Sequence, residues 1–358
     1  MVTRRGAWIR YQDPLTDEQL SFAIENYRVA ILQPWETEAA AILKQARPDM
    51  TVLAYKCLSS VRDYEDGPIH TSGVSLEEAE EAGEEWFAHR EDGSRIQWAS
   101  YPGHWQMAVW EQEYRDRWCG NVVDELEGSA WDGVMADNDV FDDYYGLRPP
   151  IEGGRAMPDI RAAMDLFVPQ VGEQLAEAGK LLVPNIAESR REPGRWARHA
   201  AWGGGFEEVW LAWSPVDFLD PVSAMDQMEE LRGPGMSIMR IATDGRDEHP
   251  NVLYGLAALW VFGGTEQAYF SATDHDGYSG TPFVPQLNWD LGAPVEAPQQ
   301  RGNGWSREFS EGWSAVNLND NKRRSISFRI PAGLRAVDGS PAPEKVTLQP
   351  HEGVLYRR

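Results

Sequence analysis

The chain alternates between short β-rich runs and helical runs from residue 28 onward, and this alternation restricts the folds open to it. Eight runs are predicted to be strands: residues 28–35, 51–59, 105–109, 132–136, 181–186, 207–213, 237–243 and 266–272. Helix-prone runs separate them, and the clearest one, residues 158–179, carries an apolar stripe at helical spacing. Eight such units are typical of a (β/α)8 TIM barrel, an α/β fold, whereas a doubly wound sheet more often stops at about five to seven strands.

The character of the sequence changes after Tyr278, where Pro and Gly become frequent and helical periodicity disappears. Turn sequences such as Asp338-Gly339 separate short β-prone runs at residues 313–318, 325–330, 345–348 and 354–356. We therefore predict a boundary within residues 280–297. Residues 1–280 are predicted to form the barrel, and residues 281–358 a small C-terminal antiparallel β appendage packed on it.

The charge balance argues against nucleic acid as a partner. Lys and Arg number 33 against 57 Asp and Glu, and a chain with the resulting formal net charge of −24 repels a phosphate backbone. Apolar runs such as residues 255–262 are too short to span a bilayer, and the first residues lead into no apolar segment of a signal peptide. We expect a soluble protein without a membrane partner, cytoplasmic or released without a visible signal peptide; the oligomeric state stays open.

Carboxylates dominate the predicted C-terminal ends of the strands, which is where TIM barrels place their catalytic groups. Asp137, Asn138 and Asp139 follow the strand at 132–136, and Glu188 follows the strand at 181–186. Other candidates lie at strand ends or beside them: Trp35, Tyr55, Glu207, Glu208, Trp210, Asp244 and Asp274. Because Glu207 and Glu208 are adjacent, only one of them can face the mouth of the barrel. The glycines at 203–205 are predicted to form a turn before the strand at 207–213.

This set of residues suits the hydrolysis of glycosidic bonds. That reaction needs one carboxylic acid to protonate the leaving oxygen and one carboxylate to act as nucleophile or to activate water. The 16 tryptophans add aromatic rings of the kind that hold sugar faces. The seven histidines form neither an HxH nor an HExxH spacing, and the sequence contains no GxSxG, so we predict no metal, no cofactor and no serine nucleophile.

Two motifs extend this interpretation to a family. The segment WDGVMADND at 131–139, together with GGFEEVW at 204–210, resembles hypothetical glycoside hydrolase families of the barrel type, similar to the α-1,4-polygalactosaminidase group. The segments at 290–294, 305–309 and 312–317 are similar to the pattern, in those families, of an arginine-bearing strand before a small β element. The resemblance implies a catalytic Asp at position 137 and a catalytic Glu in the motif at 204–210.

The hypothesis is therefore a retaining or inverting glycoside hydrolase of a polysaccharide or oligosaccharide. Asp137 is predicted as the nucleophile or base, and the acid is predicted to be among Glu207, Glu208 and Glu188. Substrate contacts are predicted for Trp35, Tyr55, Asn138, Asp139, Trp210, Asp244 and Asp274, with Asp139 in a solvated loop. Two alternatives remain open: a non-catalytic carbohydrate-binding protein on a barrel scaffold, and a barrel hydrolase or lyase with a non-sugar substrate.

Overall fold

A computed structural model describes the whole chain apart from residues 1–4, 12–13, 232, 264–266, 275–276 and 322. Eight parallel strands form one sheet in the order β7-β6-β3-β2-β1-β10-β9-β8. They are β1 (Gly6–Arg10), β2 (Tyr27–Leu32), β3 (Thr51–Cys57), β6 (Gly133–Asp137), β7 (Leu181–Pro184), β8 (Gly204–Glu207), β9 (Met236–Thr243) and β10 (Ala268–Asp274). The two ends of this order, β7 and β8, are joined by the parallel bridges Leu182–Gly203 and Asn185–Phe206. The predicted TIM-barrel class is confirmed.

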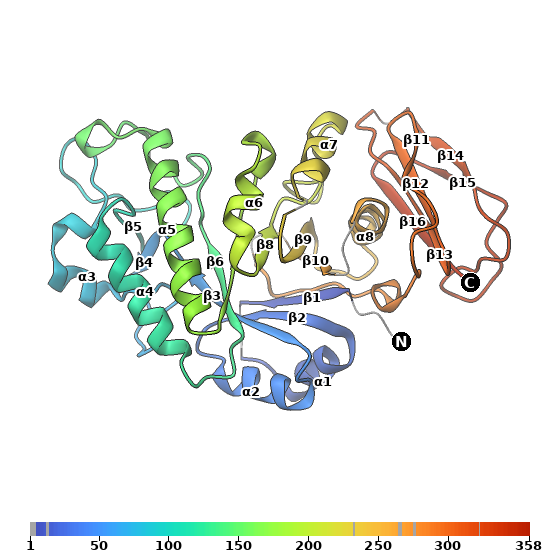
Figure 1. Cartoon of the computed structure of the whole chain (residues 1–358). Helices are drawn as coiled ribbons and strands as arrows, with labels where there is room; N and C mark the ends of the chain where they lie inside the picture. Colours follow the sequence, from blue (N-terminus) through green and yellow to red (C-terminus); the bar gives the residue numbers. More distant parts are fainter. Residues whose placement is uncertain (1–4, 12–13, 232, 264–266, 275–276, 322) are drawn as a thin grey trace. The chain divides into compact units, whose positions relative to one another are not determined.

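Helices lie between the strands along the chain (Figure 1). They are α1 (Asp17–Asn26), α2 (Thr37–Ala46), α3 (Leu76–Ala82), α4 (Gln112–Leu126), α5 (Met157–Glu177), α6 (Arg195–His199), α7 (Pro221–Glu230) and α8 (Pro250–Phe262). Several begin at well-formed caps. Thr16 and Gln19 form a capping box at α1, while the Asp220 side chain accepts two backbone hydrogen bonds in front of α7, whose first residue is Pro221.

The prediction of eight barrel strands is right in number, but one predicted strand belongs to another sheet. The run at 105–109 contributes β5 (His104–Gln106), which pairs antiparallel with β4 (Ser60–Arg62) in a separate two-stranded sheet. The missing barrel strand is β1, and it was not predicted. All five residues of β1 are buried, so this strand shows no alternation between polar and apolar positions. The run at 105–109 was misplaced because a short β-prone run does not indicate which strand it pairs with.

The predicted strand at 207–213 is also wrong, because β8 ends where that strand was expected to begin. Gly204 and Gly205 lie within β8 rather than in a turn before it. A side chain on Gly205 would meet the ring of Trp196 at 2.7 Å, so the glycine allows a close approach between strand and helix. The consequence is that Glu207 and Glu208 stand at the C-terminal end of a barrel strand. The first residue of the predicted eighth strand, Glu266, lies outside the described residues.

The chain forms two compact units. The first comprises Met1–Ala30, Glu207–Arg232 and Met236–Arg358, and the second comprises Ile31–Phe206 and Gly233–Gly235. In the first unit, α8 is buried on nearly all sides because it contacts β9 and β10 as well as the C-terminal strands β13 and β16. A side chain on Gly353 would meet the Ala257 side chain and the Leu253 carbonyl at 2.6 Å, so this glycine lets β16 lie directly on α8.

The predicted C-terminal antiparallel strands are present in the first unit. One sheet contains β11 (Gln299–Arg301), β12 (Gly304–Phe309), β13 (Gly312–Asn317) and β16 (Glu352–Arg357), and a second contains β14 (Ile326–Arg329) and β15 (Lys345–Leu348). An apolar core that includes Trp313, Phe328, Leu348 and Tyr356 joins the two sheets.

In the second unit, β6 and β7 approach closely, since a side chain on Gly133 would meet the Leu181 carbonyl oxygen at 2.1 Å. Asp132, just before β6, accepts hydrogen bonds from the Lys44 ammonium group at 2.9 Å and from the Val52 amide at 2.8 Å. These contacts fix the position of the first residues of β6, and thereby the position of Asp137 at its C-terminal end. None of the described helices is long and apolar enough to cross a membrane.

Candidate active site

Asp137 occupies the C-terminal end of β6, in the second unit, and its carboxylate is held by three donors. The Tyr55 hydroxyl on β3 donates to Oδ2 at 2.7 Å, and the Asn185 amide, just after β7, donates to Oδ1 at 2.9 Å. The backbone N–H of Asn138 donates to the same oxygen at 2.8 Å. Because β3 and β7 are the two neighbours of β6 in the sheet, three adjacent strand ends converge on one carboxylate. Such donors fix its orientation and stabilise its negative charge.

Tyr55 is itself positioned by charged residues from the chain segment that follows β3. The Arg62 guanidinium donates to the Tyr55 hydroxyl at 3.3 Å and to Glu65 at 3.0 Å, and the Glu65 carboxylate also accepts from the backbone N–H of Thr71. The hydroxyl of Tyr55 therefore accepts from Arg62 and donates to Asp137. Neither Arg62 nor Glu65 was among the predicted residues, although they lie directly after a strand end, where barrel catalytic loops begin.

Asn138 turns the chain away from β6 and is buried. Its backbone has φ 67°, a left-handed conformation that Asn tolerates better than most residues. The Ser59 hydroxyl donates to its carbonyl oxygen at 2.7 Å, and its own amide donates to the Cys57 sulfur at 3.1 Å and accepts from Tyr145. The amide group is thus engaged by the protein, and we assign Asn138 to supporting the loop.

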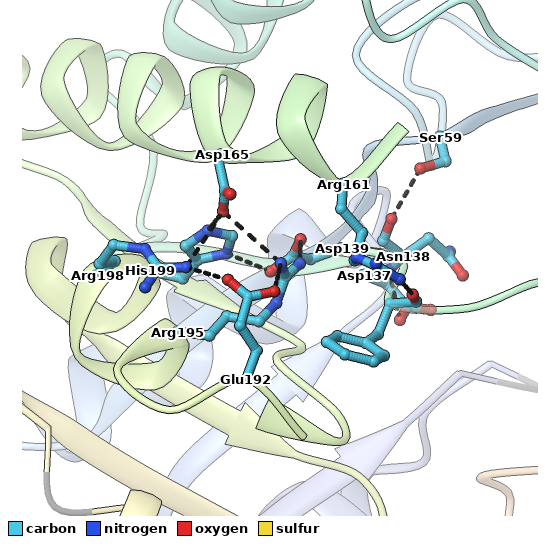
Figure 2. A network of polar contacts seen from close by, with 11 residues as sticks. Ser59, Asp137, Asn138, Asp139, Arg161, Asp165, Glu192, Arg195, Arg198 and His199 are labelled. Carbon is cyan, nitrogen blue, oxygen red and sulfur yellow. Dashed lines mark hydrogen bonds and ion pairs between the residues drawn. The ribbon is translucent and has the colours of Figure 1, made fainter. Parts of the chain in front are cut away.

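Asp139 lies at the centre of a buried charge network rather than in a solvated loop, so that expectation is wrong (Figure 2). Arg195 donates to its Oδ1 at 2.6 Å, and the Nδ1 atom of His199 lies 2.5 Å from its Oδ2. The other ring nitrogen of His199 lies 2.7 Å from Asp165 on α5. The side chains of Asp139, Arg195 and His199 have no exposed surface, and a polar group loses its hydration on burial, which explains why all three are paired.

The environment of His199 favours its charged form. Burial alone lowers the pKa of an imidazole, but the carboxylates of Asp139 and Asp165 outweigh burial and raise the pKa of His199 to about 9. Burial likewise raises the pKa of the Asp139 carboxyl, and Arg195 and His199 reverse that effect, so its pKa is lower than usual. At neutral pH Arg195 and His199 are therefore cations facing the anions Asp139 and Asp165, and these pairs tie the loop after β6 to α5 and α6.

Glu188, the third predicted acid, is held by cations. It follows β7 with φ 62°, is 4% exposed, and accepts hydrogen bonds from Arg190 at 3.1 Å and from Arg191 at 3.0 Å. The Tyr144 hydroxyl also donates to it. Both oxygens of this carboxylate are thus engaged by neighbouring side chains, and little of it is open to a substrate.

The two glutamates at the end of β8, in the first unit, differ in exposure. Glu207 has no exposed surface, and its Oε1 accepts the backbone N–H of Val209 at 2.9 Å. Glu208 is only partly buried and accepts a hydrogen bond from the Tyr278 hydroxyl. Burial raises the pKa of the Tyr278 phenol well above its ordinary value, so this hydroxyl remains a donor.

Arg240 on β9 supports this arrangement in the first unit. Its guanidinium lies 4.8 Å from the centre of the Tyr278 ring and donates to the Glu208 carbonyl oxygen at 3.3 Å, to Thr273 at 2.7 Å and to the Asp274 carbonyl oxygen at 3.1 Å. In these contacts its donors go to neutral oxygens and to an aromatic face. Arg240 was not predicted, because its position in the middle of a buried strand gives no sequence signal.

The remaining predicted residues divide into exposed and buried positions. Trp35, after β2, is 45% exposed, whereas Trp210 is 2% exposed and donates its indole N–H to the Gly255 carbonyl. Asp244, after β9, pairs with Arg246 at 2.5 Å. Asp274, at the end of β10, accepts hydrogen bonds from Ser279 and from the backbone of Gly280. Of these four, Trp35 alone presents a broad apolar face to solvent.

Aromatic side chains from several loops of the second unit form a cluster. Its members were not predicted from the sequence. The rings of Trp98 and Tyr145 stack at 3.8 Å between centroids, and Tyr101 meets both rings edge-on. Tyr64, Tyr101 and Tyr144 keep large exposed faces, between 38% and 54%. The DDYY sequence at 142–145, two residues after the DGVMADND segment, is the signal from which Tyr144 and Tyr145 could have been found.

No group of three or more His, Cys, Asp and Glu side chains in the described part of the chain is arranged to hold a metal ion. The Asp137 carboxylate is oriented by a phenol, a side-chain amide and a backbone amide. Such a group can act as a nucleophile or as a base.

The family model of hypothetical glycosyl hydrolase family 15 matches residues 44–313, well over half of the chain. This match confirms the resemblance drawn from the motifs at 131–139 and 204–210, both of which lie inside the matched region. A search of the curated proteins by sequence finds no match.

Three solved structures to which this chain is similar have little sequence identity to it. The noncanonic maltogenic α-amylase AmyB from Thermotoga neapolitana is 9% identical, with a TM-score of 0.54 over 98% of this chain and 96% of that one. An α-amylase from Anoxybacillus is 9% identical, with a TM-score of 0.52 over 98% of this chain and 97% of that one. The glycoside hydrolase domain of PelA from Pseudomonas aeruginosa is 13% identical, with a TM-score of 0.48 over 80% of this chain and 97% of that domain.

Proposed function

The chain belongs to hypothetical glycosyl hydrolase family 15 and is a glycosidase with a TIM-barrel fold, and from this premise we propose that it cleaves a polysaccharide or oligosaccharide by a two-carboxylate mechanism. Asp137 is the nucleophile or the base. The observation that carries this assignment is the set of three donors from β3, β6 and β7 that orients its carboxylate at a strand end. In a TIM barrel the C-terminal strand ends carry the catalytic residues.

Glu208 is the general acid in this proposal. An acid must reach the leaving oxygen of the sugar, and Glu208 keeps exposed surface whereas Glu207 has none. Glu188 is less suited because it is nearly fully buried and its carboxylate contacts the guanidinium groups of Arg190 and Arg191. Glu207 is assigned to holding the chain after β8 through the backbone N–H of Val209.

Aromatic residues are assigned to holding the sugar faces. Trp35 supplies an exposed indole after β2, and Tyr101 and Tyr144 supply exposed phenol rings from the loops after β3 and β6. Aromatic rings with a polar edge suit ligands that present both C–H faces and hydroxyl groups.

The test is a screen of the wild type and Asp137→Asn against bacterial, fungal and plant polysaccharides, with released reducing ends and product size as the readout. We expect release by the wild type alone. The anomeric form of the first product, followed by NMR, then distinguishes retention from inversion, since a covalent intermediate preserves the configuration and direct attack by water inverts it. Equal release by both proteins would contradict the role of Asp137. Glycan binding by the wild type without any release would favour the carbohydrate-binding alternative.

A further inference from the structure

The C-terminal sheets of the first unit carry a hollow that the proposed glycosidase chemistry does not use. Its volume is about 620 Å³, within the range of roughly 300–1,000 Å³ typical of small-molecule sites. Four cations line it: Arg301 at the end of β11, Arg323 and Arg324 in the segment before β14, and Lys345 at the start of β15. No Asp or Glu is among the described residues that line the hollow.

This concentration of positive charge is unusual in a chain with a formal net charge of −24. Elsewhere many cations are matched by carboxylates, as Arg95 is by Glu84 and Arg198 by Glu192. None of the four cations of the hollow forms an ion pair with a described residue. The exposed acidic residues Asp320 and Glu344 are sequence neighbours of lining residues, but they do not line the hollow themselves.

The register of β14 and β15 places a further cation, which does not line the hollow, opposite Lys345. Arg329 stands directly opposite Lys345 on the antiparallel pair, and both side chains are exposed. Like charges at directly opposed positions destabilise a sheet. An anion in the hollow would relieve that repulsion.

Hydrogen bonds hold two of the arginines of the hollow in place. The buried amides of Asn317 and Asn319 donate to the carbonyl oxygen of Arg324 at 3.0 Å and 3.3 Å, and this fixes the backbone from which that arginine projects. The Arg301 guanidinium donates to the Ser327 carbonyl on β14 at 2.5 Å, which holds it beside the same strand. Preorganised donors lose less entropy when they bind a ligand.

We propose that this hollow binds an acidic sugar, a carboxylate-bearing residue such as a uronic acid within an oligosaccharide. Arginine presents a planar fork of donors that matches a carboxylate, and the Asn and Ser side chains of the lining can bind sugar hydroxyls. The described lining contains no aromatic ring on which a nucleobase could stack, and the acidic remainder of the chain repels a long polyanion. Its apolar content is limited to Ile326, which gives a lipid surface little to hold.

The test measures binding to the full-length Asp137→Asn variant, so that no cleavage intervenes and the outcome is independent of the catalytic proposal. The probes are tetragalacturonate, a neutral tetrasaccharide of the same length, and a single-stranded oligonucleotide of matched charge, studied by calorimetry at low and high salt. We expect tetragalacturonate to bind, the neutral sugar to bind at least about tenfold more weakly, and the affinity to fall as salt screens the charges.

Variants locate the site. Arg323→Ala with Arg324→Ala, and separately Lys345→Ala, should each weaken tetragalacturonate binding about tenfold, while Arg335→Ala, an exposed arginine of the same unit outside the hollow, should leave it unchanged. All four positions are exposed, so the fold should persist, and circular dichroism checks it. No binding of tetragalacturonate, equal binding of the neutral sugar, tighter binding of the oligonucleotide, or equal losses in the control variant would each overturn the proposal.

Discussion

Two strand ends of this molecule carry carboxylates in different surroundings. At the end of β6, Asp137 receives one hydrogen bond from each neighbouring strand and one from its own loop. At the end of β8, Glu207 has no exposed surface, whereas Glu208 is partly exposed and accepts a hydrogen bond from the Tyr278 hydroxyl. A carboxylate oriented by several donors suits a nucleophile or base, whereas an acid must reach the leaving oxygen and therefore needs exposed surface.

Removing the charge at the end of β6 should have the largest effect on activity. Asp137→Asn keeps the size of the side chain but loses the nucleophile or base, so kcat should fall by at least about 10³-fold while the unfolding temperature changes little. Steady-state kinetics on the polysaccharide found in the screen measures this. Asp226→Asn, an exposed carboxylate on α7, is the matched control and should keep full activity. A loss below about tenfold in Asp137→Asn would remove Asp137 from the mechanism.

The next largest effect separates the two glutamates of β8. Glu208→Gln should lower kcat by about 10²- to 10³-fold, because a general acid contributes on that scale. Glu207→Gln should leave kcat within about threefold and lower the stability instead, since it disturbs a buried contact with the Val209 amide. Kinetics and thermal unfolding of both variants check this. The reverse pattern would exchange the roles of the two residues.

Removing a hydrogen-bond donor from Asp137 should lower kcat by less than removing its charge. Tyr55→Phe removes one hydrogen bond and should lower kcat about tenfold without changing KM much, and Asn185→Ala should act similarly. Because both side chains act on the same carboxylate, their effects should be coupled. The fold loss in kcat of the double variant should therefore differ from the product of the two single losses. Losses that multiply without any coupling would show that the two donors act on separate groups.

The smallest expected effect concerns stability rather than rate, and it tests the charge network behind β6. The pKa of His199 is about 9 in the folded chain against an ordinary 6.5, so the folded state holds the proton more tightly. The stabilisation is fully present below about pH 6.5 and is lost as pH rises through 9. It amounts to roughly 3 kcal/mol of unfolding free energy. Urea unfolding between pH 6 and 9.5 measures it, and His199→Gln should lack this dependence. An identical dependence of the unfolding free energy on pH in both proteins would assign this dependence to groups other than His199.

Much of the fold could be predicted because it depends on periodic patterns. The alternation of strand and helix identified the TIM barrel, and the DGVMAD run placed Asp137 at a strand end, where the structure has it. The error at β8 arose because Gly204 and Gly205 resemble a turn in sequence, and only the approach of Trp196 shows why glycine occupies a strand there. A shift of three residues in that strand decided where Glu207 and Glu208 stand.

The partners of the site residues could not be predicted in the same way. The burial of Asp139 depends on Arg195 and His199, which lie 56 and 60 residues later in the chain, and no local pattern connects them. The same holds for Arg240, whose contacts to Glu208, Thr273 and Asp274 exist only once β9 lies beside β10. Sequence patterns identify positions at strand ends, whereas pairing between distant segments decides what each carboxylate can do.

The most direct test of the central claim, that Asp137 and Glu208 have different chemical roles, compares two leaving groups. A glycoside with a dinitrophenyl leaving group needs no protonation, so it bypasses the acid but still requires the nucleophile or base. We predict that Glu208→Gln recovers most of the wild-type kcat/KM on this substrate relative to the polysaccharide, because kcat/KM reports the first bond cleavage, and that Asp137→Asn stays inactive on both. Recovery by Asp137→Asn, with Glu208→Gln inactive on both substrates, would contradict the assignment.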